Sequence, residues 1–373
     1  MAVLLNEPRK PMSGVPDEAE EPWWEPGRDA NDEVELIPKA ARSAETGLYH
    51  PLLLPLSQAQ NAVARLEASV ATVSPAVAEG IRARTAYSEA AGWLAHVSTW
   101  IHPNDLALRD SGLTGSYIAA ARIGKLQAHL PSMAAMGTTP ELVFSEQYVV
   151  VALRFARYWR RLVEFKTWQP LADVAAVRET VDALEWRRGP MQDSDIQAWL
   201  VPVLGHDEVP DLISAGRAAR DWMNTHIQSD PLAIDAIFLA ACIWREKGFG
   251  RSISLPFWSA TAYRHHRLTS AVGIPWLIGF LECITEAAQT ARYELDKLRR
   301  VEDRAAILKR SVRSHLPAAI DAVIRVPVIT ARGLAKRLAI THQASLGLLK
   351  QLIEAGIIKE ATGRGAWRAF VTV

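Results

Sequence analysis

The clearest concentration of side chains with a chemical role lies in residues 315–373, and it indicates contact with nucleic acid. Thr330 can cap a helix with the sequence ARGLAKRLAI. Thr341 can cap a second helix, HQASLGLLKQLIEAG, which Gly356 can end. Small Ala335 in the first helix would allow the two to cross closely. Two helices joined by a short turn are typical of the helix-turn-helix motif, whose second helix enters the major groove.

The residues after the second helix predict a β-hairpin. Residues 357–361 have the composition of a strand, 362–365 form a turn with two glycines, and 367–371 supply the return strand. We therefore expect a winged helix-turn-helix domain over 315–373. Its segments "TARGLAKRLAIT", "LLKQLIEAGII" and "TGRGAWRAFV" resemble the winged-helix tails of bacterial regulators.

This resemblance implies a set of DNA-contacting residues. They comprise three basic residues on the supporting helix, the cap and exposed positions of the second helix, and two arginines of the wing. These residues are Arg332, Lys336, Arg337, Thr341, His342, Gln343, Leu346, Lys350, Arg364 and Arg368. Gly347 stands where such helices often hold a large polar residue. Because only His342 and Gln343 can read base edges well, binding should depend mainly on phosphates and therefore on salt. A winged helix used for protein contact remains the structural alternative.

A second candidate site is the glycine-containing loop IWREKGFGR at 243–251. It resembles the active-site loop HxFx(D/E)GNGR of Fic proteins, which transfer nucleotidyl groups to hydroxyls. Gly248, Gly250 and Arg251 match that pattern. However, Ile243 replaces the base histidine and Lys247 replaces the acidic magnesium ligand, while Phe249 takes the place of the asparagine. We therefore expect no catalytic residue here.

Glu89 would join a ligand pocket with Gly248, Gly250 and Arg251 if its carboxylate were buried. It lies within an alanine-rich helical stretch, 83–94. Convergence of Glu89 and Arg251 on one pocket is the feature that distinguishes a nucleotide-binding body from a scaffold.

The chain as a whole resembles an uncharacterised family of rhizobial, often plasmid-borne, proteins. That family joins a domain of unknown function to a C-terminal helix-turn-helix DNA-binding domain. The resemblance covers about 50–373, and its motifs are "ARTAYSEAAGWL", "IHPNDLALRDSG", "GRSISLPFW" and "FLECITEAA".

The elements that must position these sites are helices. Ser57 can cap a first helix ended by Pro75, and apolar periodicity predicts further helices, among them 114–130, 274–300 and 302–325. We expect a mainly α fold. Its expected parts are an acidic flexible arm, a helical body, a helical connector and the winged domain: 1–46, 47–300, 301–314 and 315–373.

The net charge conceals an uneven distribution. The 373 residues carry a formal charge of +1, but residues 1–38 hold 10 acids and 3 bases, whereas 310–373 hold 10 bases and 3 acids. Such asymmetry is a pointer to nucleic-acid or membrane contact. No apolar run reaches the ~20 residues of a membrane helix. The two cysteines, Cys242 and Cys283, read as reduced core thiols.

These observations predict a cytoplasmic protein that binds double-stranded DNA, with no metal and no cofactor. The first hypothesis is a transcriptional regulator whose helical body forms a homodimer or senses a small-molecule effector. One alternative is a diverged Fic-like protein that binds or transfers nucleotides. Another is a protein-interaction module in which the acidic arm covers the basic tail.

Overall fold

The computed structural model describes most of the chain outside the first 38 residues. The described ranges are 39–97, 99–111, 146–184, 192–205, 209–225, 234–261, 273–308, 314–361 and 368–373. The chain divides into two compact units, Met1–Tyr49 and His50–Val373. Residues 1–38 of the expected arm over 1–46, the helix over 114–130 and the wing turn lie outside the described residues. Residues 39–46 are helical, so the flexible arm does not extend to residue 46 as predicted.

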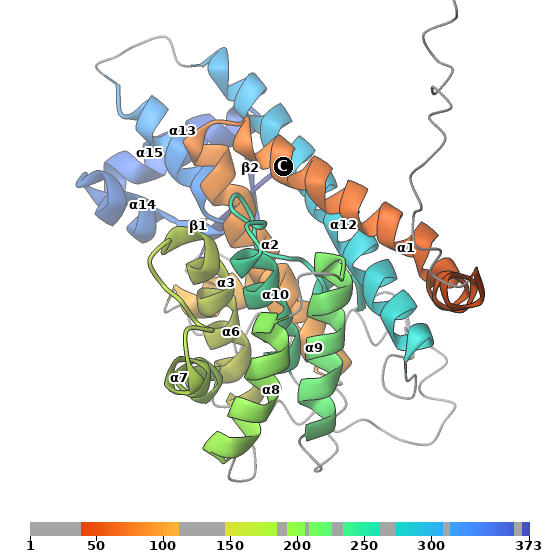
Figure 1. Ribbon diagram of the computed structural model, residues 1–373. Helices are drawn as coiled ribbons and strands as arrows, with labels where there is room; N and C mark the ends of the chain where they lie inside the picture. The colour runs from red at the N-terminus through yellow and green to blue at the C-terminus, as the bar shows by residue number, and fades with distance from the viewer. Residues whose placement is uncertain are drawn as a thin grey trace, which may run out of the picture. The chain divides into compact units, whose positions relative to one another are not determined.

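The second unit is built mainly from helices, as the sequence predicts (Figure 1). Before the C-terminal domain these are α1 (Lys39–Ala71), α2 (Pro75–His96), α3 (Pro103–Asp110), α6 (Glu146–Glu164), α7 (Val174–Leu184), α8 (Asp193–Gly205), α9 (Asp211–Thr225), α10 (Ile234–Glu246), α11 (Trp258–Thr261) and α12 (Ile274–Ala306).

Two helix predictions are wrong. Ser57 is not a cap, because α1 begins at Lys39 and continues through Pro51 and Pro55. The buried stripe that includes Leu52, Leu56, Ala59, Val63, Leu66 and Val70 holds this helix against the core despite its prolines. The helix expected over 302–325 is divided, since α12 ends at Ala306 and the next helix starts at Leu316.

Helix α2 is the centre of the unit. It packs against α3, α6, α11, α12 and the first helix of the C-terminal domain. Five fully buried tryptophans fill the surrounding core: Trp93, Trp159, Trp222, Trp258 and Trp276. Cys242 and Cys283 are both buried and are not joined by a disulfide, which confirms their assignment as core thiols. Among the described helices, none combines the length and apolar character that crossing a membrane requires.

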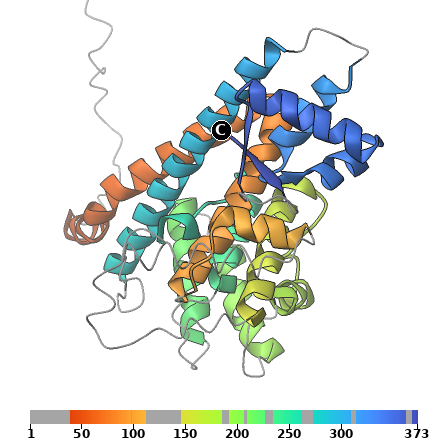
Figure 2. The ribbon, with the colours of Figure 1, turned by 180° about the vertical axis from the view of Figure 1, so that it is seen from behind.

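The C-terminal domain combines three helices with a small antiparallel sheet (Figures 1 and 2). Its elements in chain order are α13 (Leu316–Arg325), β1 (Ile329–Thr330), α14 (Ala331–Leu338), α15 (His342–Glu354), β2 (Ile358–Glu360) and β3 (Ala369–Thr372). The strand order is β1-β3-β2. In the register Lys359 pairs with Val371, and Ile329 pairs with Phe370. The predicted hairpin strands are thus present, and β1 is an addition that sequence reasoning missed.

Candidate nucleic-acid interface

Helices α14 and α15 begin and end where their local signals predict. The Thr330 hydroxyl accepts a hydrogen bond from the Gly333 amide at 3.0 Å, and the Thr341 hydroxyl accepts one from the Ala344 amide at 3.2 Å. Gly356 has φ +66° and ends α15. Each threonine satisfies an amide that a helix start would leave unpaired, so both predicted caps are confirmed.

The turn between the two helices is tight and fixes their crossing. Ala339 has φ 52°, the left-handed conformation that usually favours glycine. The Ile340 amide donates to the Ala335 carbonyl at 3.0 Å and closes the turn. Ser345 is fully buried, and its hydroxyl donates to the Ala331 carbonyl at 2.8 Å. This contact ties α15 to the first residue of α14.

Helix α15 presents one exposed face. Gln343, Gly347 and Gln351 follow one another at four-residue spacing and are all exposed, as are the neighbouring His342 and Lys350. The opposite face, which carries Ser345, Leu348, Leu349 and Leu352, is buried. Leu346 is half-buried and packs against the core, so only part of this side chain reaches the surface that the resemblance assigned to it.

Gln351 is a polar residue on this face that sequence reasoning missed. It lies eight positions after Gln343, two helical turns further along, and that spacing was the signal that could have identified it. Gly347 leaves the surface between the two glutamines open, because nothing lies within 4 Å of the position that a Cβ would occupy.

The supporting helix α14 carries three exposed positive charges. Arg332, Lys336 and Arg337 are all exposed. None of the three makes an ion pair with any residue in the described ranges. Their charges are therefore available to an external anion.

Three other basic residues of the domain already have a glutamate partner. Arg368, the residue before β3, donates to Glu360 Oε2 at 2.9 and 2.6 Å, and these hydrogen bonds raise the pKa of its guanidinium. Lys350 lies 3.8 Å from Glu354, one turn further along α15. Arg325, at the end of α13, pairs with Glu79 of α2. Fewer basic side chains of this domain are therefore available to DNA than its net charge in the sequence suggests. Arg364 lies outside the described residues.

The domain is held firmly on the helical body through α2. The Arg84 guanidinium donates to the carbonyls of Ile324 at 2.7 Å and Val326 at 3.0 Å, and to the Thr372 hydroxyl at 3.2 Å. At Gly80 the helices approach so closely that a Cβ would lie 2.2 Å from the Ile324 oxygen. Domain and body therefore form one packed unit.

Glu89, the first of the predicted pocket residues, is 1% exposed and fully engaged. Its carboxylate accepts hydrogen bonds from the amides of Phe257, Trp258 and Ser259 at 2.9, 2.6 and 3.2 Å, and from the Ser259 hydroxyl at 2.6 Å. Burial raises its pKa, while these hydrogen bonds oppose the rise. These hydrogen bonds cap helix α11, so Glu89 has a structural role.

The glycine loop is held by a different carboxylate. Glu67 of α1 accepts hydrogen bonds from the amides of Gly250, Arg251 and Ser252 at 3.3, 2.6 and 3.2 Å. Gly248 and Gly250 both have positive φ, which lets the loop turn these amides inward. Arg251 is exposed, and its side chain donates to the Gly248 carbonyl at 3.0 Å. Glu89 and Arg251 thus have separate partners.

Comparison with known proteins supports the assignment of the C-terminal domain. Residues 316–372 match a family model described as an HTH DNA binding domain. These residues run from α13 to β3, so the chain carries the predicted helix-turn-helix DNA-binding domain. No curated protein matches the chain.

Among solved structures, the chain is similar to a Fic family protein from Desulfovibrio desulfuricans G20. The identity is 12% and the TM-score 0.38, over 84% of this chain and 96% of that one. A TM-score this low carries no argument about the fold or the function of this chain.

Proposed function

We propose that this protein is a DNA-binding transcriptional regulator in which α15 is the recognition helix. The observation that carries the proposal is the exposed polar face of α15 beside the three unpaired cations of α14. His342 and Gln343 lie in the first turn of α15, where helix-turn-helix proteins contact base edges. A glutamine can hydrogen-bond adenine in two places, and each such pair discriminates by about 1–3 kcal/mol.

The cations of α14 supply the phosphate contacts. Arg332, Lys336 and Arg337 are exposed along the helix that precedes the recognition helix, the element that crosses the DNA backbone in this motif. The backbone N–H groups at the start of α15 add a site that favours an anion. Winged helix-turn-helix proteins also place a hairpin near the DNA, and the β2–β3 strands supply its base here.

The described residues of the glycine loop do not support the nucleotide-transfer alternative. The glycine loop lacks the base and the acidic residue of the Fic pattern at Ile243 and Lys247. Its inward-facing amides are already bound by Glu67.

Selection from a random duplex library with the full-length protein tests the proposal. We expect a defined sequence to be enriched, and a promoter carrying it to respond to the protein in a reporter assay. His342→Ala and Gln343→Ala should relax the preference at different positions of the site, since both residues are exposed and their loss does not disturb the core. Arg300→Ala, an exposed change on α12, is the matched control. A pool with no enriched sequence would reject the recognition role.

A further inference from the structure

A cavity lies where the DNA-binding domain meets the helical body. Its volume is about 750 Å³, large enough for a small organic molecule. The end of α13 contributes Arg325, and the body contributes residues from the end of α1, the start of α2, the last turns of α6 and the loop at Ser252. None of the pocket residues predicted from the sequence lines it.

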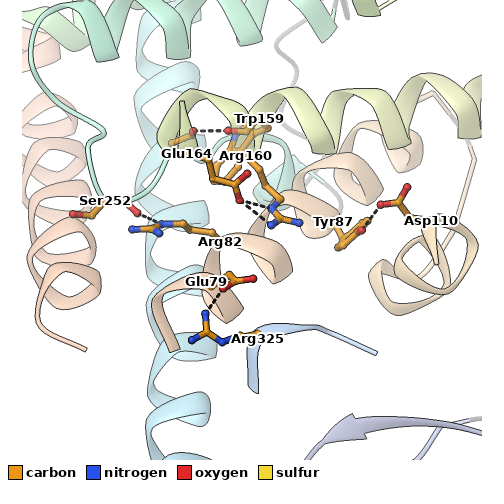
Figure 3. A network of polar contacts seen from close by, with 10 residues as sticks. Glu79, Arg82, Tyr87, Asp110, Trp159, Arg160, Glu164, Ser252 and Arg325 are labelled. Atoms are coloured by element: carbon orange, nitrogen blue, oxygen red, sulfur yellow. Dashed lines mark hydrogen bonds and ion pairs between the residues drawn. The ribbon is translucent and has the colours of Figure 1, made fainter. Parts of the chain in front are cut away.

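The charged residues that line this cavity are three arginines and two glutamates (Figure 3). Arg160 donates to Glu164 through two nitrogens, at 3.1 and 2.8 Å, and Arg325 pairs with Glu79. Each glutamate therefore forms an ion pair with one arginine. Arg82 is the third arginine, and its positive charge is the surplus left after these two pairs.

Arg82 has unused hydrogen-bonding capacity. Its Nε donates to the Ser252 carbonyl at 2.7 Å, and its two terminal nitrogens bond to no residue in the described part of the chain. In Figure 3 the side chain lies between the Arg160–Glu164 pair and the Glu79–Arg325 pair. It is half-buried, and this burial lowers its pKa. An unpaired, partly desolvated guanidinium presents two parallel donors that fit a carboxylate or phosphate.

The cavity also has apolar lining residues. They are Val70, Ala71, Val73, Pro75 and Ala78. The cavity thus offers both a surplus cation and aliphatic groups, the combination that binds a small organic acid with an apolar part.

We propose that this cavity binds a small organic anion through Arg82, and that the bound anion alters DNA binding. The link is Arg325, which belongs to the DNA-binding domain and faces the same cavity. An anion that attracts Arg325 competes with Glu79 for it and so changes one attachment of the domain to the body. Anion binding and DNA binding are then coupled in both directions. The coupling rests on the proposed DNA-binding function, whereas the binding site does not.

Thermal unfolding of the full-length protein tests the site. The probes are sodium hexanoate and sodium phosphate at about 10 mM, enough to detect millimolar affinity, with sodium chloride of equal ionic strength as the reference. We expect at least one probe to raise the Tm of the wild type by about 2–4 °C. The rise should persist in Arg300→Gln and vanish in Arg82→Gln. Arg160→Gln should weaken it, and circular dichroism verifies that each variant is folded.

DNA affinity measured with and without the active probe tests the coupling. We expect the dissociation constant of the wild type to change at least about five-fold, with no change in Arg82→Gln. No Tm rise with either probe, or an equal rise in Arg82→Gln, would overturn the site. A Tm rise with unchanged DNA affinity would overturn the coupling alone. A protein that shows the Tm rise but binds no DNA either with or without the anion would contradict the proposed function instead.

Discussion

Replacing Arg84 by alanine should detach the DNA-binding domain from α2. The arginine donates to two backbone carbonyls at the end of α13, those of Ile324 and Val326, at 2.7 and 3.0 Å. A hydrogen bond from a charged donor contributes about 1.5–3 kcal/mol, and a buried acceptor left unpaired costs about 1–3 kcal/mol. For the two carbonyls together we expect Arg84→Ala to lower the free energy of unfolding by about 3–5 kcal/mol.

Urea denaturation followed by tryptophan fluorescence measures this loss. Arg84→Lys keeps the charge but can direct only one donor group, so it should lose about half as much. Arg300→Ala, exposed on α12, should change the free energy of unfolding by less than about 0.5 kcal/mol. If Arg84→Ala lay within about 1 kcal/mol of the wild type, the three contacts that it makes with the domain would not hold the domain in place.

Three further predictions concern single positions. Ala339→Gly should raise the free energy of unfolding by about 0.5–1 kcal/mol, because it relieves the left-handed strain of the helix-turn-helix turn; urea titration measures it, and a loss would contradict the strained geometry. Gly347→Ala should stabilise the exposed helix by a similar ~1 kcal/mol, read from the same titration, and destabilisation would show that this position is not open. Glu89→Gln should destabilise, since four donors converge on the carboxylate. Because burial raises the pKa of Glu89 in the folded state, its contribution to stability is complete below the unfolded pKa and is lost as pH rises through the folded value. The wild type should therefore show a decline in stability above about pH 4.3 that Glu89→Gln lacks, and identical pH profiles would contradict the raised pKa.

The C-terminal domain could be predicted from sequence because its signals are local. Thr330, Thr341 and Gly356 mark helix ends through contacts within four or five residues. The glycine-rich sequence after residue 361 likewise separates two segments with the composition of strands. Strand β1 escaped prediction because two residues carry no periodicity, and it exists only by pairing with β3.

The attachments between domain and body could not be predicted from sequence. Arg84 and Ile324 are 240 positions apart, and Glu79 and Arg325 are 246 apart. Nothing in the neighbourhood of either residue specifies such a partner. For the same reason Glu89 read as a candidate ligand site, although its partners at 257–259 make it a helix cap.

The salt dependence of duplex DNA binding tests the central claim most directly. The full-length protein and a triple alanine variant of Arg332, Lys336 and Arg337 are titrated against one duplex from low to high salt, with Arg300→Ala as control. If each cation contacts a phosphate, the logarithm of the wild-type affinity falls linearly with the logarithm of salt. The triple variant's slope should then be shallower by about 2.7, because each lost contact removes about 0.9. Equal slopes for the two proteins, or no wild-type binding at about 50 mM salt, would contradict the assignment of this surface to DNA.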